Sequence, residues 1–122
     1  IVGGYLSDKS ALQRKTLHKL AKSQLIWDRR IAMLATFYDI QKGSADRALE
    51  IATMLLHDKH DLIQKAVGWM LREIGQKCSL ATEKSFLNKY AAVMPRTMLR
   101  YAIEKFSKKE RDFYLSRKNK LT

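Results

Sequence analysis

The chain has 122 residues, of which 46% are hydrophobic and 30% charged, and this composition argues against both a disordered and a membrane-embedded protein. Five glycines and one proline are too few for the tight turns of an all-β fold and favour long helices. A formal net charge of +12 and a pI near 10.0 indicate a polyanionic partner, with a basic surface that serves only solubility as the alternative.

The first predicted helical pair ends at Gly43. Residues 1–6 read as the end of an element, and a surface helix follows over residues 10–21. Ser23 is a candidate cap for the second helix, which ends at the glycine. The apolar residues of this second helix recur at helical spacing and should face the core: Trp27, Ile31, Leu34 and Tyr38.

The second pair begins at Ser44, a candidate cap for a helix that runs through Leu56. The polar residues 57–60 form the turn before the fourth helix, which should end at Gly75. This fourth helix has a continuous apolar face: Ile63, Ala66, Val67, Met70, Leu71 and Ile74.

The third pair comprises a helix over residues 80–92 and one that starts near Pro95, which the first turn of a helix tolerates. The residues expected to face inward are Phe86, Leu87, Tyr90, Met98, Leu99, Ala102, Ile103 and Phe106. Residues 107–110 match a capping box and open a short last helix through Phe113 and Leu115. We therefore predict an all-α fold, an α-solenoid of antiparallel helical pairs with about three pairs and a short last helix.

A repeat of 35 residues relates the second helices of the three pairs. Arg30, Lys65 and Arg100 fall at equivalent positions, and a small or β-branched apolar residue follows two positions after each. In a solenoid each pair buries its apolar face against the next, so equivalent residues line one face. Equally spaced cations on a concave face match the phosphates of a duplex, with a chance alignment of basic residues as the alternative.

No motif for a metal, a cofactor or a catalytic nucleophile is recognisable. His18, His57 and His60 do not form a metal site with the distant Cys78, and no Gly-rich phosphate loop, nucleophile elbow or CxxC occurs. We therefore expect neither a metal nor a cofactor. The single cysteine suits a reducing compartment, and no membrane span or signal peptide is recognisable, so we expect a cytoplasmic protein.

Three collinear stretches, residues 25–34, 57–74 and 94–106, strongly resemble the AlkD-like DNA alkylation repair glycosylase family. The resemblance covers almost the whole chain. It implies a HEAT-like solenoid that grips alkylated duplex DNA in its concave face and excises N3- and N7-alkylated purines without flipping the base into a pocket. It also implies that residues 1–122 form a single HEAT-like repeat domain, the C-terminal portion of a longer protein.

The resemblance assigns two residues to the catalytic cleft. Arg30, in Trp-Asp-Arg-Arg-Ile-Ala, matches the family's cleft arginine, and Trp69, in Gly-Trp-Met-Leu-Arg-Glu, matches its second cleft tryptophan. Gly68, beside this tryptophan, leaves room for an approaching group. Cleavage of the glycosidic bond develops positive charge on the deoxyribose, which aromatic faces and a carboxylate stabilise. The alternatives are a solvated arginine and a tryptophan that only fills the core.

The candidate DNA-binding residues are Arg29, Arg30, Lys65, Arg72, Arg96 and Arg100. Arg72 and Arg96, together with Lys105, are equally consistent with a solvated helix face or with ion pairs to Glu73 or Glu104.

The family's catalytic aspartate and first cleft tryptophan belong to a segment that precedes the stretch matching residues 1–6, and neither Asp8 nor Asp28 matches that motif. We therefore expect the chain as given to bind DNA but to be inactive alone. A missing N-terminal segment or self-association should cover the apolar residues at the N-terminal end. The open alternatives to a glycosylase are a non-catalytic nucleic-acid-binding HEAT repeat module and a protein-binding helical scaffold.

Overall fold

A computed structural model describes residues 14–118, and every regular element within them is a helix. A helical segment over residues 14–21 is followed by α2 (Ile26–Ala35), α3 (Phe37–Gln41), α4 (Asp46–Met54), α5 (Asp61–Lys77), α6 (Leu80–Tyr90), α7 (Arg96–Ala102) and α8 (Lys108–Lys118). The all-α fold and the succession of helical pairs are confirmed. The predictions for residues 1–6 and for a helix start at residue 10 lie outside the described residues.

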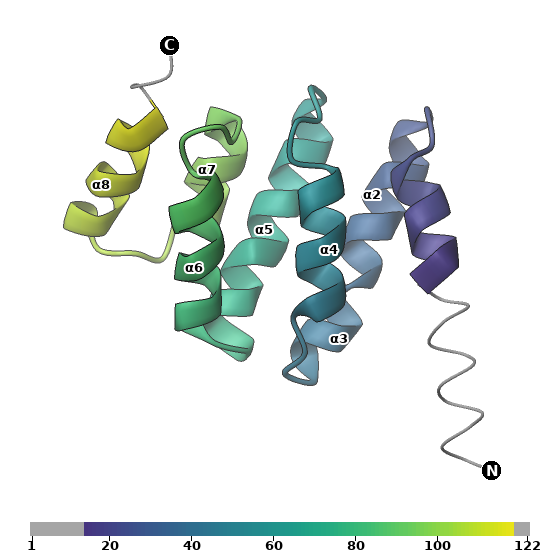
Figure 1. The fold of residues 1–122 in the computed structure, drawn as a ribbon, viewed down its shortest axis with the longest axis horizontal. Coiled ribbons are helices and arrows are strands. Elements are labelled where there is room, and N and C mark those ends of the chain that lie inside the picture. The colour runs from purple at the N-terminus through teal and green to yellow at the C-terminus, as the bar shows by residue number, and fades with distance from the viewer. Residues whose placement is uncertain (1–13, 119–122) are drawn as a thin grey trace.

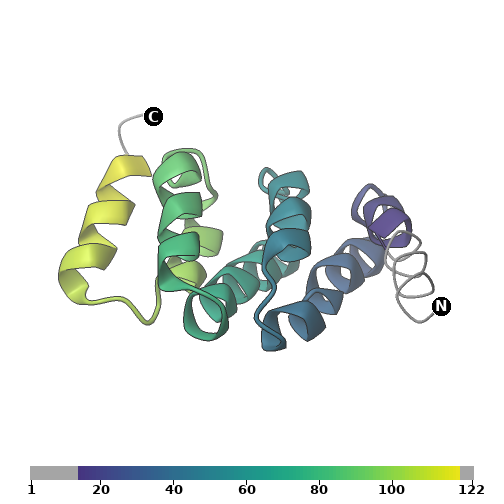
Figure 2. The same cartoon turned by 60° about the horizontal axis from the view of Figure 1, so that its bottom comes forward.

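The helices form two layers (Figure 1). The segment 14–21, α4 and α6 lie in one layer, and α2, α5 and α7 lie in the other, which we call the second-helix layer. Figure 2 shows the same two layers from another side. Helix α5 is central, because it packs against α2, α3, α4, α6 and α7. Among the described residues, no helix is long and apolar enough to cross a membrane.

The core follows the apolar faces predicted for α5 and α7. Every residue predicted to face inward from α5 is buried, and so is every one predicted for α7 and the turn after it. On α6, Phe86 and Leu87 are buried and Tyr90 is half-buried. A helical period of 3.6 residues therefore identified the correct face wherever one side of the helix is uniformly apolar.

The inward face predicted for the helix that follows Ser23, which corresponds to α2 and α3, is wrong. Trp27, Ile31 and Tyr38 are exposed to 64%, 53% and 62%, and Leu34 is only half-buried. The residues of this region that are buried instead are Ala32, Met33, Thr36 and Ile40. This stretch has apolar residues on two faces, and the side with the small Ala32 packs more closely against α4 and α5. The predicted single helix is also split into α2 and α3.

Three predicted helix ends differ in the structure. Leu25 and Ala45 occupy the N-cap positions of α2 and α4, and neither side chain makes a capping hydrogen bond. The Ser23 hydroxyl instead accepts a hydrogen bond from the Leu25 N–H (3.1 Å) in the turn before α2. Ser44 likewise precedes the N-cap. Helix α5 does not end at Gly75 but continues for two residues.

The last helix begins as predicted. Ser107 Oγ accepts a hydrogen bond from the Glu110 N–H (3.3 Å), as expected for the first half of a capping box. Helix α8 packs against α7 through Tyr114, which is 4% exposed and whose ring lies 5.8 Å from that of Phe106. Phe113, in contrast, is 53% exposed.

Helix α7 crosses α5 at Gly68. A Cβ atom built on this glycine would lie 2.5 Å from the carbonyl oxygen of Met98 and 2.5 Å from the Cβ atom of Tyr101. Any side chain at this position would therefore displace the backbone of α7. The group that approaches Gly68 is therefore α7, a helix of the same chain.

The carboxyl group of Glu83 lies against Gly75, where α6 meets α5. Glu83 is 1% exposed, and a Cβ atom built on Gly75 would overlap its Oε1 atom. Burial raises the pKa of Glu83 to about 8, although the nearby charges of Arg72 and Lys84 act in the opposite direction. Gly75 therefore leaves space for the Glu83 side chain of α6, and it does not end α5.

Replacing Gly68 with alanine should destabilise the protein by about 2 kcal/mol. Alanine gains about 1 kcal/mol over glycine in helix propensity, but the displacement of α7 costs about 3 kcal/mol. Urea unfolding followed by circular dichroism measures the difference. Gln76→Ala, at an exposed position of α5, is the control and should change the stability by less than about 0.5 kcal/mol. An unchanged or higher stability of Gly68→Ala would show that the two helices do not touch here.

The free energy of unfolding should fall by about 3 to 5 kcal/mol between about pH 5 and pH 8 because of Glu83. The folded protein holds a proton on this residue up to about pH 8, whereas the unfolded chain releases it near the ordinary pKa of 4.5. Glu83→Gln supplies a neutral side chain at every pH, so it should match the original stability at pH 5 and exceed it at pH 8. Parallel pH profiles of the two proteins in urea unfolding would contradict this assignment.

Candidate nucleic-acid interface

Helices α2, α5 and α7 surround a cleft of about 190 Å³ on the second-helix layer. The residues that line this α2–α5–α7 cleft are Arg30, Leu34, Leu62, Lys65, Ala66, Trp69, Arg72 and Tyr101. The cleft contains Arg30 and Trp69, the two residues that the sequence assigned to catalysis, together with two of the predicted DNA-binding cations, Lys65 and Arg72. Residues from different helical pairs therefore meet at one place.

Trp69 is held from one side and open on the other. Its indole Nε1 donates a hydrogen bond to Glu73 Oε1 (3.2 Å), one turn further along α5. Its ring also lies 6.1 Å from the ring of Phe37, with a tilt of 36° between the two planes. The side chain nevertheless remains 38% exposed. Trp69 is therefore not buried core filler, and its orientation is fixed while part of it faces the cleft.

Two of the three cations of the cleft, Lys65 and Arg72, have carboxylate partners. Lys65 Nζ lies 2.9 Å from Asp61 Oδ2, and this carboxylate, with a smaller effect of Tyr101, raises the pKa of Lys65. Arg72 Nη1 donates a hydrogen bond to Glu104, so one of the ion pairs that the sequence analysis left open as an alternative forms and links α5 to α7. Both carboxylates are well exposed, at 59% and 58% of their side chains. An incoming anion can therefore replace them at little cost.

A second, wider groove adjoins the cleft. It has a volume of about 510 Å³ and is lined by Arg72, Arg100, Tyr101, Glu104 and Lys105. Arg72 and Tyr101 line both spaces, so the groove continues from the cleft across α7. Arg30, Lys65 and Arg100, the three cations of the 35-residue repeat, thus line two adjoining depressions.

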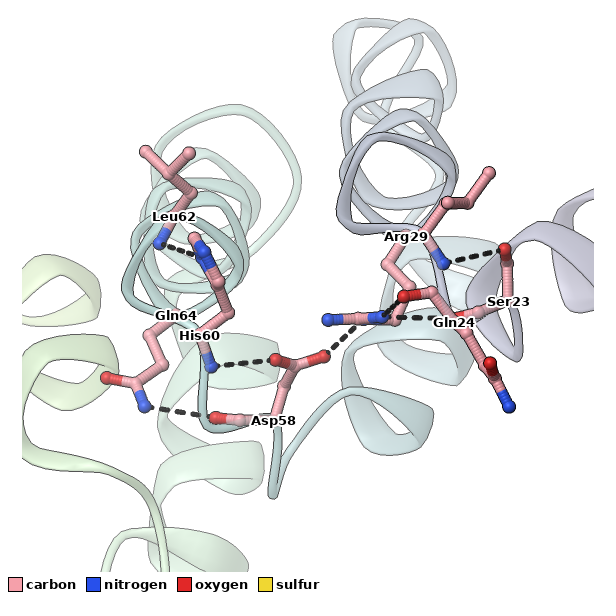
Figure 3. A network of polar contacts seen from close by, with 8 residues as sticks. Ser23, Gln24, Arg29, Asp58, His60, Leu62 and Gln64 are labelled. Carbon is pink, nitrogen blue, oxygen red and sulfur yellow. Dashed lines mark hydrogen bonds and ion pairs between the residues drawn. The ribbon is translucent and has the colours of Figure 1, made fainter.

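Arg29 has a different environment from Arg30. Its Nε atom donates to Asp58 Oδ2 (2.7 Å), and Nη1 donates to the carbonyl oxygens of Ser23 and Gln24, both at 3.0 Å (Figure 3). Only 18% of the Arg29 side chain and 9% of the Asp58 side chain are exposed. These bonds are charge-assisted and tie the start of α2 to the turn before α5. The structure therefore gives Arg29 a role in positioning α2.

The same aspartate also organises the start of α5. Asp58 Oδ1 accepts a hydrogen bond from the His60 N–H (2.9 Å), and its carbonyl oxygen accepts one from Gln64 Nε2 (3.0 Å). His60 Nδ1 in turn accepts from the Leu62 N–H (3.2 Å) and caps the helix. The start of α2 and the start of α5 are thus joined by one network, and Arg30 of α2 and Lys65 of α5 line the same cleft.

Two of the predicted DNA-binding residues, Arg29 and Arg96, line neither the cleft nor the groove. Arg96 is half-buried in the first turn of α7. Lys105, which the sequence analysis considered only as a further candidate, does line the groove.

None of the eight residues that line the cleft is acidic. The nearest carboxylates are already engaged: Asp61 by Lys65, Glu73 by Trp69, and Glu104 by Arg72. Within residues 14–118, no group of three or more His, Cys, Asp or Glu side chains could hold a metal ion. The described part of the cleft is thus suited to binding an anion next to an aromatic face, and it offers no free carboxylate for bond cleavage.

Sequence reasoning did not identify Tyr101 or Phe37 as residues of this region. Tyr101 occupies the repeat position of Ala66, which lines the same cleft, so an aromatic residue at that position was a usable signal. Phe37 supports Trp69 from a helix that the sequence did not separate from α2. No feature of the sequence marks that contact.

A family model described as DNA alkylation repair enzyme matches residues 1–106, which include every residue of the cleft and the groove. No curated protein and no solved structure gives a significant match to the chain. The matched range ends at the last residue before the cap of α8.

Replacing Glu104 with glutamine should strengthen binding to a polyanion several-fold at low salt. The change removes a negative charge from the groove and releases Arg72 from its partner. Fluorescence anisotropy with a labelled DNA duplex measures the affinity. Glu110→Gln is the matched control, because it removes the same charge from an ion pair with Lys84, which lines neither the cleft nor the groove. Equal gains in both variants would show that only net charge matters.

Proposed function

Because the chain belongs to the DNA alkylation repair enzyme family, we propose that its second-helix layer binds duplex DNA and that Arg30 and Trp69 act in the excision of N3- and N7-alkylated purines. One observation supports this most directly. The α2–α5–α7 cleft is lined by Arg30 and Trp69, the two residues that the family resemblance assigns, and by Lys65 of the 35-residue repeat.

Binding rests on the distribution of positive charge. Arg30, Lys65 and Arg72 line the cleft, and Arg100 and Lys105 extend the positive surface along the adjoining groove. DNA phosphates are contacted mainly by arginine, lysine and backbone N–H groups, and these contacts fix the register of the protein on the duplex. Tyr101 and Arg72 line both the cleft and the groove. The two depressions therefore offer phosphate contacts on either side of Tyr101.

Excision rests on the aromatic face beside these cations. Cleavage of the bond between an alkylated purine and its sugar leaves positive charge on the deoxyribose, and the π face of Trp69 can stabilise it. Glu73 and Phe37 hold the indole in place, so little reorganisation is needed when the charge develops. Arg30 acts on the phosphate backbone in this proposal. The cationic purine is itself a good leaving group.

The carboxylate of the reaction is the part that the cleft does not supply, since its described lining contains no acidic residue. The family resemblance assigns this aspartate to a segment preceding the stretch that matches residues 1–6. The same observation favours a second candidate function, a nucleic-acid-binding repeat module without catalysis. The two functions share the binding surface and differ in whether the base is released.

Duplex affinity should fall steeply with salt, and single charge variants should lower the slope of log affinity against log salt. Arg30→Gln, Lys65→Gln and Arg100→Gln each remove one phosphate contact, so each should reduce the slope by about 0.9. Lys89→Gln is the control, because Lys89 lies on α6, in the other layer. The slope of log affinity against log salt for Lys89→Gln should equal that of the original chain. No duplex binding by the original chain at low salt would contradict a nucleic-acid function and leave a protein-binding scaffold.

Excision is tested by incubating the chain with a methylated duplex and measuring the release of N3- and N7-methylpurines by chromatography. A second sample also contains a polypeptide with the segment to which the family resemblance assigns the aspartate. We expect release only in the combined sample, and a decrease of at least tenfold with Trp69→Ala at saturating protein. Binding without release in either sample would exclude the glycosylase and establish the non-catalytic module.

A further inference from the structure

We propose that Tyr101 is a positioning residue, whose hydroxyl group donates a hydrogen bond to a DNA backbone phosphate held between Lys65 and Arg72. The proposal rests on the proposed duplex-binding function and adds a neutral contact to its cationic ones. No sequence motif and no family assignment pointed to this residue. Its place between the cleft and the groove carries the argument.

The crossing of α5 and α7 determines where the Tyr101 ring lies. Its Cβ atom packs directly on Gly68, 2.5 Å from the position that a Cβ of that residue would occupy. On α5, Lys65 lies one turn before Gly68 and Arg72 lies one turn after it, so all three share one face of the helix. The Tyr101 side chain therefore emerges between the two cations.

The hydroxyl group of Tyr101 is available for a ligand. The residue is 37% exposed, and no hydrogen bond joins its hydroxyl to any of the residues that the structure describes. Tyr114 differs, because its hydroxyl donates to Asn88 Oδ1 (3.1 Å). A tyrosine that served packing alone would not need to line two cationic depressions. Tyr101 borders both.

A phosphate fits this position better than a base does. Lys65 and Arg72 supply two positive charges on either side, and tyrosine hydroxyls are regular partners of phosphate oxygens in protein–DNA complexes. Such a contact fixes the register of the duplex on the protein without reading its sequence. With the register fixed, the sugar of a nearby nucleotide can be held against Trp69, which lines the same cleft. Tyr101 thus acts through the position of the DNA.

Tyr101→Phe tests the proposal, because it removes only the hydroxyl oxygen and leaves the packing on Gly68 intact. The affinity for a duplex at low salt should fall about five- to tenfold, the loss expected for one hydrogen bond to a charged group at a partly exposed site. The slope of log affinity against log salt should not change, since phenylalanine and tyrosine carry the same charge. Lys65→Gln, in contrast, should lower both the affinity and the slope.

Two further comparisons separate this role from others. The loss should be equal for an unmodified and an alkylated duplex, because both have the same phosphates. Tyr90→Phe, on α6 in the other layer, is the matched control and should bind DNA as the original chain does. The midpoint of thermal unfolding of Tyr101→Phe should also stay within about 2 °C of the original, since the substitution leaves the helix crossing in place.

Several outcomes would overturn the proposal. An unchanged affinity of Tyr101→Phe, while the original chain binds duplex DNA, would refute the hydroxyl contact and leave the proposed function intact. A loss confined to the alkylated duplex would show that Tyr101 contacts the lesion and not the backbone. Absence of duplex binding by the original chain would refute the proposed function and, with it, the phosphate contact.

Discussion

The contact between α5 and α7 at Gly68 is the constraint on which the rest of the interface depends. A hydrogen atom in place of a side chain lets the backbone of α7 lie directly on α5. This brings Tyr101 to the cations of α5, and it places Glu104 within reach of Arg72. A wider separation of the two helices would move the groove away from the cleft. The positive surface would then consist of two separate patches.

Two cations of the candidate interface are oriented by weak ion pairs. Lys65 and Arg72 are paired with exposed carboxylates, whose net contribution to stability is small. These pairs keep the cations oriented in the absence of a ligand and offer little resistance to a phosphate. Trp69, in contrast, is fixed by Glu73 and Phe37. The surface therefore combines exchangeable ion pairs with a rigid aromatic residue, as suits a site that binds a backbone and orients a sugar.

The sequence was sufficient to predict the faces of α5 and α7, because each has a single apolar stripe at helical spacing. The 35-residue spacing also identified cations that line adjoining depressions. Periodicity failed for α2, where apolar residues lie on both faces and close packing favours the one with Ala32. It could not show that Gly68 and Gly75 accommodate neighbouring helices, or that Glu83 is buried, because these depend on partners distant in the sequence.

Arg29 and Arg30 are consecutive in the sequence and chemically identical, yet the structure places different constraints on them. The first is bonded to Asp58 and to two carbonyl oxygens, so its loss affects folding in any descendant of this protein. The second opens into the cleft, so only a function carried out there preserves it. A lineage that lost the proposed DNA binding would be free to change Arg30 while retaining Arg29. This pair of positions therefore records, across relatives, whether the surface is still in use.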